Sequence, residues 1–354
     1  MLSEDQIRSA LKEVKYPGFS RDIVSFGLIK GISFKDGKVR VRLEVTTGDQ
    51  RIPAELDVGV RQAVQQLEGV SEVAVDIKVN EPVKAAMQSG GGLTGENTIP
   101  GIKHIVAVAS GKGGVGKSTV TSNLAVAAAK AGLKVGLLDC DLYGPSMGLM
   151  FGIKDRPSVT EDERLEPHTK EGVRLMSMGF LVDDDSPVIL RGPMVTRYTQ
   201  QFLNQVNWGH LDILFLDLPP GTGDIQLTIV QTVALSGAVV VTTPQEVALI
   251  DARKAIKMFA KVNVPILGLV ENMSYFVCPN DGNQYSIFGE GGGEREAQRE
   301  KVELLAKVPL EMDVRSAGDT GKPAVASHPE SAGAHAFIEA AEKLGKILNL
   351  RIKK

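Results

Sequence analysis

Residues 111–118 read GKGGVGKS, a glycine-rich segment that contains two lysines, Lys112 and Lys117. The spacing G-x-x-x-x-G-K-S is typical of a loop that holds the phosphates of a nucleotide. In such a loop the backbone N–H groups surround the phosphates, Lys117 reaches the β and γ oxygens, and Ser118 can bind Mg²⁺. The predicted nucleotide contacts are Gly111, Lys112, Gly113, Gly114, Val115, Gly116, Lys117, Ser118 and Thr119.

The surroundings of this segment support the interpretation. The apolar run HIVAVA precedes it and a helical pattern follows it, which is the strand, loop and helix context that the motif requires. The alternative is a tight turn between a strand and a helix that binds nothing.

A carboxylate for the metal follows a second apolar run, in the sequence ILFLDLPPGTGD at residues 213–224. Mg²⁺ keeps several waters and is held by one or two protein carboxylates. Asp217 ends the apolar run, so we expect it at the carboxyl edge of a parallel sheet, where ligands bind. Pro219, Pro220 and Gly221 begin a loop that could respond to the γ-phosphate. The alternative is that Asp217 only caps its strand.

Two more acids, Asp139 and Asp141, follow a third apolar run in LLDCDLYGPS. Paired carboxylates beside phosphates would repel them unless a metal ion or a water lies between. We therefore expect Asp139 to join Ser118 and Asp217 around Mg²⁺, and Asp141 to act as a catalytic residue on the attacking water. The alternative is a pair of solvated acids at the end of a strand.

Short apolar runs must position these residues. They alternate with helical patterns and lie at residues 104–109, 135–139, 213–218, 238–243 and 266–271. This alternation predicts an α/β fold with a doubly wound, mostly parallel sheet. The carboxyl ends of the strands then share one edge, which places the loop and the acids together.

The first 80 residues have a different pattern, which predicts a small two-layer α+β domain. Residues 5–14 and 52–67 have helical spacing, and residues 73–79 alternate as in a strand. Apolar residues from Val39 to Val45 alternate with charged ones after an Asp-Gly turn, which is typical of a hairpin with one buried face. Glycine-rich residues 81–101 predict a flexible linker, so the nucleotide-binding domain is expected at 102–354.

Composition excludes some function classes. The 354 residues include 40 basic and 43 acidic side chains, a net charge of −3, so we expect no general affinity for nucleic acid. No apolar run approaches the ~18 residues of a membrane-spanning helix, and the charged start is unlike a secretory signal. Two cysteines, Cys140 and Cys278, cannot make a disulfide framework, and a cytoplasmic location is the expectation.

The segments KGGVGKST, DCD, DLPPGTGD and VENMSYFVCP closely resemble the Mrp branch, also called ApbC, of the deviant-Walker-A ATPases, which are related to MinD and the nitrogenase iron protein. The N-terminal 80 residues are similar to the small domain that often precedes bacterial members. The resemblance implies a homodimer that binds ATP, in which Lys112 acts as a catalytic cation on the partner's phosphates. It also implies that Asn272 recognises adenine; the alternative is a turn residue bonded to its own backbone.

The same resemblance implies a carrier that delivers iron–sulfur clusters to apoproteins and works with cluster assembly proteins. Family members usually have a C-x-x-C pair where this chain reads FVCPNDGN, so Cys278 is the expected cluster ligand and Asp281 replaces the second cysteine. Carboxylate is a poorer ligand than thiolate for such a centre. The alternative for Cys278 is a plain, partly buried thiol, and Cys140 is expected to be buried.

Two other functions stay open from the sequence. A MinD- or ParA-like positioning ATPase would act at a membrane or DNA surface, and the apolar stripe of residues 337–348 could lie on a membrane. A helix packed on the sheet has the same stripe, and we favour it. A non-enzymatic scaffold would use nucleotide only structurally, and the intact Lys117, Asp141 and Asp217 argue against it.

Overall fold

The computed structural model describes residues 4–14, 22–24, 28–35, 37–46, 51–67, 69–80, 99–141, 144–162, 164–180 and 192–352. The chain divides into two compact units, Met1–Gly92 and Leu93–Lys354. Most of the predicted linker, residues 81–98, lies outside the described residues.

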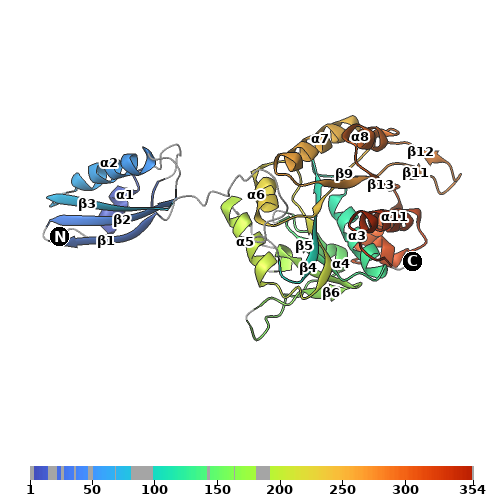
Figure 1. The fold of residues 1–354 in the computed structure, drawn as a ribbon, viewed down its shortest axis with the longest axis horizontal. Helices are drawn as coiled ribbons and strands as arrows, with labels where there is room; N and C mark the ends of the chain where they lie inside the picture. Colours follow the sequence, from blue (N-terminus) through green and yellow to red (C-terminus); the bar gives the residue numbers. More distant parts are fainter. Residues whose placement is uncertain are drawn as a thin grey trace. The chain divides into compact units, whose positions relative to one another are not determined.

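The N-terminal unit is a three-stranded sheet packed against two helices (Figure 1). Its elements are α1 (Glu4–Leu11), β1 (Ile29–Lys35), β2 (Lys38–Thr46), α2 (Arg51–Gln65) and β3 (Glu72–Asn80). Strand β2 lies in the centre, antiparallel to β1 and parallel to β3. The two-layer α+β fold is as predicted.

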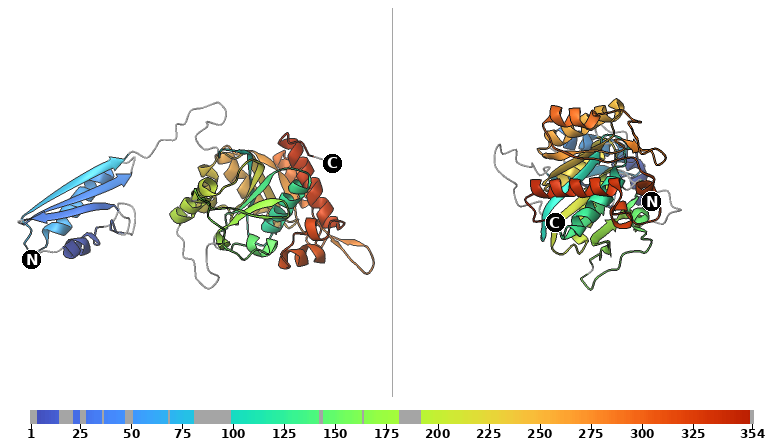
Figure 2. Two further views of the ribbon diagram at one scale, coloured as in Figure 1. Left: turned by 90° about the horizontal axis from the view of Figure 1, so that it is seen from below. Right: turned by 90° about the vertical axis from the view of Figure 1, so that its right-hand side faces the viewer.

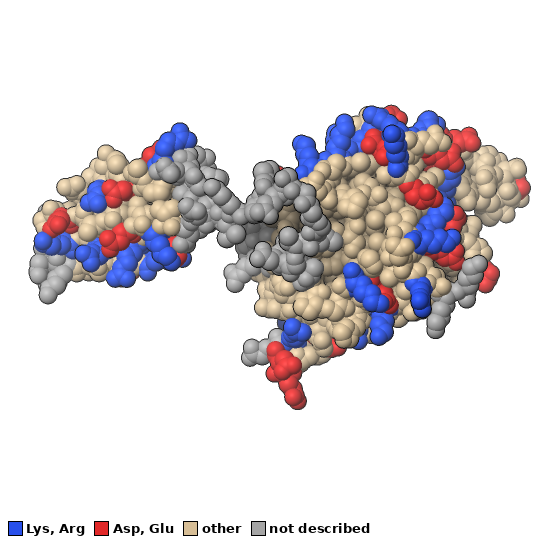
Figure 3. Space-filling view, viewed as in Figure 1, with Lys and Arg blue, Asp and Glu red and all other residues tan. Residues whose placement is uncertain are grey.

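Alternation along β2 builds the core of this unit. Its apolar residues are all at most 2% exposed: Val39, Val41, Leu43 and Val45. They pack with Leu56, Val60 and Val64 of α2. Basic and acidic side chains lie close together on this unit in the view of Figure 3, and the ion pairs Lys38–Glu72 and Lys78–Glu44 join β2 to β3.

The second unit is built on an eight-stranded sheet. Its strands are β4 (Ile102–Ser110), β5 (Val135–Asp139), β6 (His168–Lys170), β7 (Val173–Ser177), β8 (Leu211–Asp217), β9 (Gly237–Thr242), β10 (Ile266–Glu271) and β13 (Leu304–Lys307). The order is β13-β10-β9-β4-β8-β5-β7-β6, and only the edge pair β6–β7 is antiparallel. This is the predicted doubly wound, mostly parallel α/β sheet.

Helices cover both faces of this sheet (Figures 1 and 2). One face carries α3 (Lys117–Lys130), α10 (Ala324–Ser327) and α11 (Ala332–Ile347), while α4 (Met147–Phe151) and α9 (Met312–Asp319) pack beside them. The other face carries α5 (Gly192–Gln205), α6 (Asp224–Thr232), α7 (Glu246–Lys261) and α8 (Gly292–Glu300). The five central strands, β10, β9, β4, β8 and β5, are largely buried in between, so their sequences contain continuous apolar runs.

The C-terminal stripe packs on the sheet and on α3, as we favoured. Phe337 is fully buried in the core, and Ala341 and Leu344 are also buried. The stripe of α11 is therefore used within the unit and does not form a free membrane-binding face. Within the described ranges, no helix combines the length and the hydropathy needed to cross a bilayer.

Candidate nucleotide site and thiol hairpin

The phosphate loop connects β4 to α3, and its geometry requires glycine at two positions. Gly116 has a φ of 81°, and a Cβ at this position would lie 2.2 Å from Asn272 Nδ2. A Cβ at Gly111 would lie 2.1 Å from the main chain of Asp251 in α7. No other residue fits such close approaches. The loop ends at the N-terminus of α3, where unpaired N–H groups and the helix dipole favour an anion.

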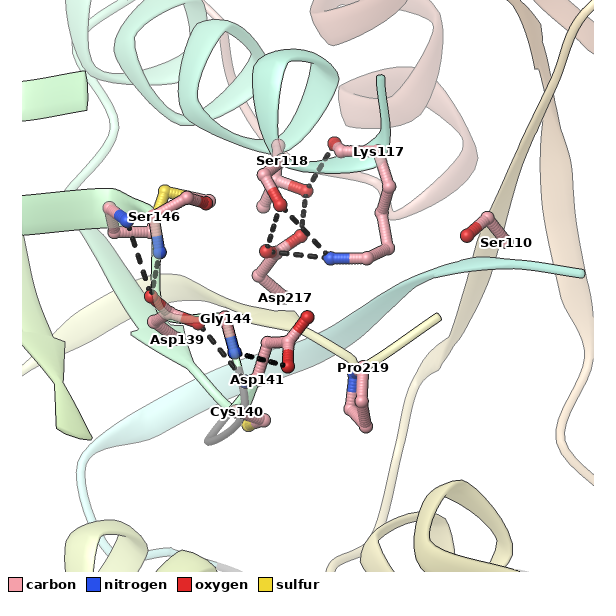
Figure 4. Close-up of polar contacts among 12 residues, drawn as sticks. Ser110, Lys117, Ser118, Asp139, Cys140, Asp141, Gly144, Ser146, Asp217 and Pro219 are labelled. Atoms are coloured by element: carbon pink, nitrogen blue, oxygen red, sulfur yellow. Dashed lines mark hydrogen bonds and ion pairs between the residues drawn. The ribbon is translucent and has the colours of Figure 1, made fainter. Parts of the chain in front are cut away.

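A buried cluster of polar side chains lies at this helix end (Figure 4). Lys117 Nζ lies 2.7 Å from Asp217 Oδ2, and the two side chains are only 6% and 0% exposed. Ser118 Oγ donates to Asp217 Oδ2 over 2.7 Å, and Thr121 Oγ1 lies 2.6 Å from Asp217 Oδ1. The structure thus brings together Lys117, Ser118 and Asp217, which the sequence predicts as one site.

Strand register explains why two of the predicted acids meet. Asp139 and Asp217 are direct partners across the β5–β8 ladder, at the carboxyl end of both strands. Asp139 Oδ2 accepts hydrogen bonds from Ser146 N, Met147 N and Ser177 Oγ, and its Oδ1 accepts one from Asp141 N. Asp139 is therefore not a solvated acid. Its hydrogen bonds stabilise the segment that follows β5.

The electrostatics of Asp139 and Cys140 follow from burial. Burial, and next the negative charge of Asp217, raise the pKa of Asp139 to about 7. Burial also raises the pKa of the Cys140 thiol well above its usual value. Cys140 is 2% exposed, which confirms the expectation that it is buried. A thiol that stays protonated in the core is a poor metal ligand.

Asp141 lies at the edge of an open cavity of about 630 Å³. Its carboxylate accepts a hydrogen bond from Gly144 N at 3.2 Å. The same cavity is lined by Pro219, Pro220 and Gly223 of the loop after β8. The buried amide of Gln226 donates to Pro219 O, which ties this loop to the start of α6. Asp141 thus shares this space with Pro220, and Pro220 Cβ would lie 3.9 Å from a Cβ placed at Gly113 of the phosphate loop.

A second cavity of about 330 Å³ adjoins the phosphate loop at Gly116, and its lining is largely apolar. It is formed by Gly116, Thr119, Asn272, Met273, Phe276, Pro309, Leu310, Glu311, Met312, Val314 and Arg315. Asn272 Nδ2 donates to Val115 O over 2.9 Å, so this amide bonds the phosphate loop and not its own backbone. Mostly apolar pockets of this size with a few polar groups are typical of small-molecule sites.

The two lysines of the loop have different surroundings. Lys117 is buried in the ion pair with Asp217. Lys112 is half-buried; its carbonyl accepts from Ser110 Oγ, while its ammonium makes no ion pair with any residue in the described part of the chain. The Lys112 ammonium can thus contact a ligand or another chain.

Cys278 lies on a small hairpin that the sequence does not predict, formed by β11 (Phe276–Val277) and β12 (Gln284–Tyr285). Asp281 is in its turn and accepts hydrogen bonds from Asn283 N at 2.9 Å and from Tyr285 Oη at 2.8 Å. These two bonds, and a weaker one from the side chain of Cys278, lower the pKa of Asp281. Cys278 itself is half-buried.

Some residues of the site are not predicted from the sequence. Thr121 lies one helical turn after Lys117, so its spacing alone could have pointed to the same face of α3. Ser177 ends β7, a short strand that the sequence analysis does not identify. Met312 lines the apolar cavity but lies in no motif, and Phe276 lies in the segment VENMSYFVCP, which assigns it no role.

Comparison with known proteins identifies relatives that are described as P-loop NTPases and iron-sulfur proteins. Residues 101–345 match the family described as NUBPL iron-transfer P-loop NTPase, and residues 4–77 match the family described as iron-sulfur cluster assembly protein. An iron-sulfur cluster carrier protein of Synechocystis sp. is 43% identical over 353 residues, with 98% of each chain covered. In Arabidopsis thaliana, an iron-sulfur protein required for NADH dehydrogenase, mitochondrial, is 50% identical over 264 residues, 74% of this chain and 84% of that protein.

Solved structures show the same fold. A nucleotide-binding protein of Archaeoglobus fulgidus in complex with ADP has a TM-score of 0.59 at 40% identity, covering 67% of this chain and 92% of that chain. The septum site-determining protein MinD of Pyrococcus horikoshii, complexed with Mg-ADP, has a TM-score of 0.55 at 26% identity, covering 71% and 100%. With the matched P-loop, the acids at the sheet edge and the full-length relatives, the chain belongs to the family of NUBPL iron-transfer P-loop NTPases.

Proposed function

We propose that the protein is an ATP-binding and ATP-hydrolysing homodimer that carries iron–sulfur clusters to apoproteins in the cytoplasm. The observation that carries the proposal is the buried cluster of Lys117, Ser118 and Asp217 at the head of α3. Charged groups are rarely buried without a functional or structural partner. The related protein from Archaeoglobus fulgidus, which binds ADP, supports a nucleotide as the ligand. The names of the relatives support the cluster as the cargo.

In this proposal the phosphates lie in the loop, and Lys117 turns from Asp217 to their oxygens. Ser118 Oγ and Asp217 Oδ2, 2.7 Å apart, are oxygen donors of the kind that Mg²⁺ prefers. When bound, Mg²⁺ would neutralise phosphate charge. Asp139 already accepts four hydrogen bonds, which favours a positioning role over the predicted direct contact with the metal.

The nucleoside would lie beside the loop. The apolar cavity adjoins Gly116 and Thr119, and Asn272 is on its wall. An adenine ring suits such a lining, because its faces are apolar and its edge can bond an amide. Asp141 faces the larger cavity beside Pro219 and Pro220 and would accept a proton from the attacking water.

The variant Lys112→Ala tests the proposed dimer. Replacing Lys112 with alanine should leave nucleotide affinity within about threefold, because the side chain is outside the buried cluster. The ATP-dependent dimer should weaken by about 30-fold, roughly 2 kcal/mol, because each protomer loses a cation that reaches the partner's phosphates. Light scattering after gel filtration with a non-hydrolysable ATP analogue measures the fractions of monomer and dimer.

The matched control is Lys103→Ala. Lys103 lies near the amino end of β4, the strand that precedes the loop of Lys112, and it pairs with Asp212 at 2.6 Å. This variant should dimerise like the parent protein. Normal dimerisation of the Lys112 variant would show that this lysine does not cross the interface.

The cluster is the proposed cargo, and Cys278 is its proposed ligand. The sequence has two cysteines, and they form a natural pair of test and control. After anaerobic reconstitution with iron and sulfide, Cys278→Ala should lose the visible absorbance and the bound iron, because Cys278 is the half-buried thiol. Cys140→Ala should keep both, because Cys140 is 2% exposed and lies in the core. Equal loading of the parent protein and Cys278→Ala would rule out this ligand.

A further inference from the structure

The chain runs directly from the apolar cavity to Cys278. Asn272 and Phe276 are both on the cavity wall, and Cys278 follows two residues later. Ser274 N donates to Val308 O over 2.9 Å, and Leu310 N donates to Tyr275 O over 2.7 Å. These bonds fix the segment alongside residues 308–310, so Phe276 marks the point where it leaves the body of the unit.

Beyond Phe276 the backbone bonds are almost all within the hairpin. Phe276 pairs with Tyr285 and Val277 with Gln284. Cys278 N donates to Asn283 O at 3.0 Å, and Gly282 N donates to Cys278 O at 2.9 Å. The hairpin extends outward from the unit in Figure 2, and residues 279–286 are exposed. Its position therefore depends on how firmly Phe276 is held at its base.

Phe276 borders a cavity. It lines the 330 Å³ cavity together with Met312, Val314 and Arg315. Met312 is 66% exposed although it is a large apolar side chain. A flat ring in the cavity would pack on Phe276 and cover part of Met312.

We propose that Phe276 is a positioning residue that links occupancy of this cavity to the accessibility of the Cys278 thiol. A nucleotide base packed on Phe276 stabilises the base of the hairpin and slows its local opening, which holds Cys278 against Asp281 and the turn. Removal of the nucleotide loosens the hairpin and exposes the thiol. The inference rests on the proposed function in taking a nucleotide as the ligand of the cavity.

The test measures the rate at which Cys278 of the full chain reacts with the thiol reagent DTNB, with and without saturating Mg-ADP. Cys140 is buried, and Cys278→Ser should abolish the reaction, which assigns the signal to one thiol. Mg-ADP should slow the reaction of the parent protein by about fivefold. Phe276→Ala should bind ADP more weakly because it loses its packing on the base, and its thiol rate should be the same with and without Mg-ADP at a concentration that calorimetry shows to be saturating.

Val277→Ala is the matched control, because Val277 is on the same strand but does not line the cavity. In Val277→Ala, Mg-ADP should slow the reaction of Cys278 as much as it does in the parent protein. If Phe276→Ala failed to bind ADP, Phe276→Leu, which keeps an apolar side chain there, should bind it and show reduced slowing. A parent protein that binds ADP with no change in thiol rate would overturn this inference alone. A parent protein that binds no nucleotide would overturn the proposed function as well.

Discussion

Lys117→Ala is expected to weaken ATP binding by about 100-fold, because a charge-assisted hydrogen bond to phosphate contributes about 3 kcal/mol. The same change is expected to destabilise the protein without nucleotide. Asp217 is fully buried, and Lys117 is its cationic partner at 2.7 Å. Removing one member of a buried ion pair costs about 3 kcal/mol, since the other charge is left without its partner. Calorimetry measures the affinity and urea unfolding measures the stability.

A double variant separates the two effects. Lys117→Met with Asp217→Asn removes both charges, and an amide at position 217 can still bond Ser118 and Thr121. Its stability should return to within about 1 kcal/mol of the parent protein, because replacing a whole buried pair is often neutral. Its ATP affinity should stay low. Recovery of binding in the double variant would show that Lys117 acts on stability and not on the phosphates.

The architecture of the second unit is largely predictable from the sequence. Its five central strands are buried on both faces, so each appears as a continuous apolar run, and two of them, Val135–Asp139 and Ile266–Glu271, have the predicted bounds. The outer strands β6, β7 and β13 are missed because they are short and carry charged residues such as Arg174 and Lys307. The β11–β12 hairpin has only two residues in each strand, too few to show a period.

The site is predictable where its signals are local. The loop spacing identifies Lys117 and Ser118, and the end of an apolar run identifies Asp217. The contacts between them depend on strand register and on packing between residues about a hundred positions apart, which no local pattern contains. For the same reason the bond from Asn272 to Val115 O could not be foreseen.

Asp141→Asn is expected to reduce steady ATP turnover by about 1,000-fold, because a general base contributes 10²–10⁴ and an amide cannot accept the proton. Asparagine keeps an oxygen for the hydrogen bond from Gly144 N, so the turn after β5 should remain intact. Nucleotide affinity should change by less than about threefold, since Asp141 lies outside the Lys117 cluster. Phosphate release measures the turnover, and calorimetry measures the affinity.

A second acid, Asp224, lines the same cavity and provides the control for the role of Asp141 as the base. Asp224 also lines the 630 Å³ space but begins α6, where its charge faces a helix N-terminus. Asp224→Asn should keep turnover within about twofold and lower stability by less than about 1 kcal/mol. If Asp224→Asn abolished turnover and Asp141→Asn did not, the base would be on α6. If neither affected turnover, the water would be activated by a group outside this cavity.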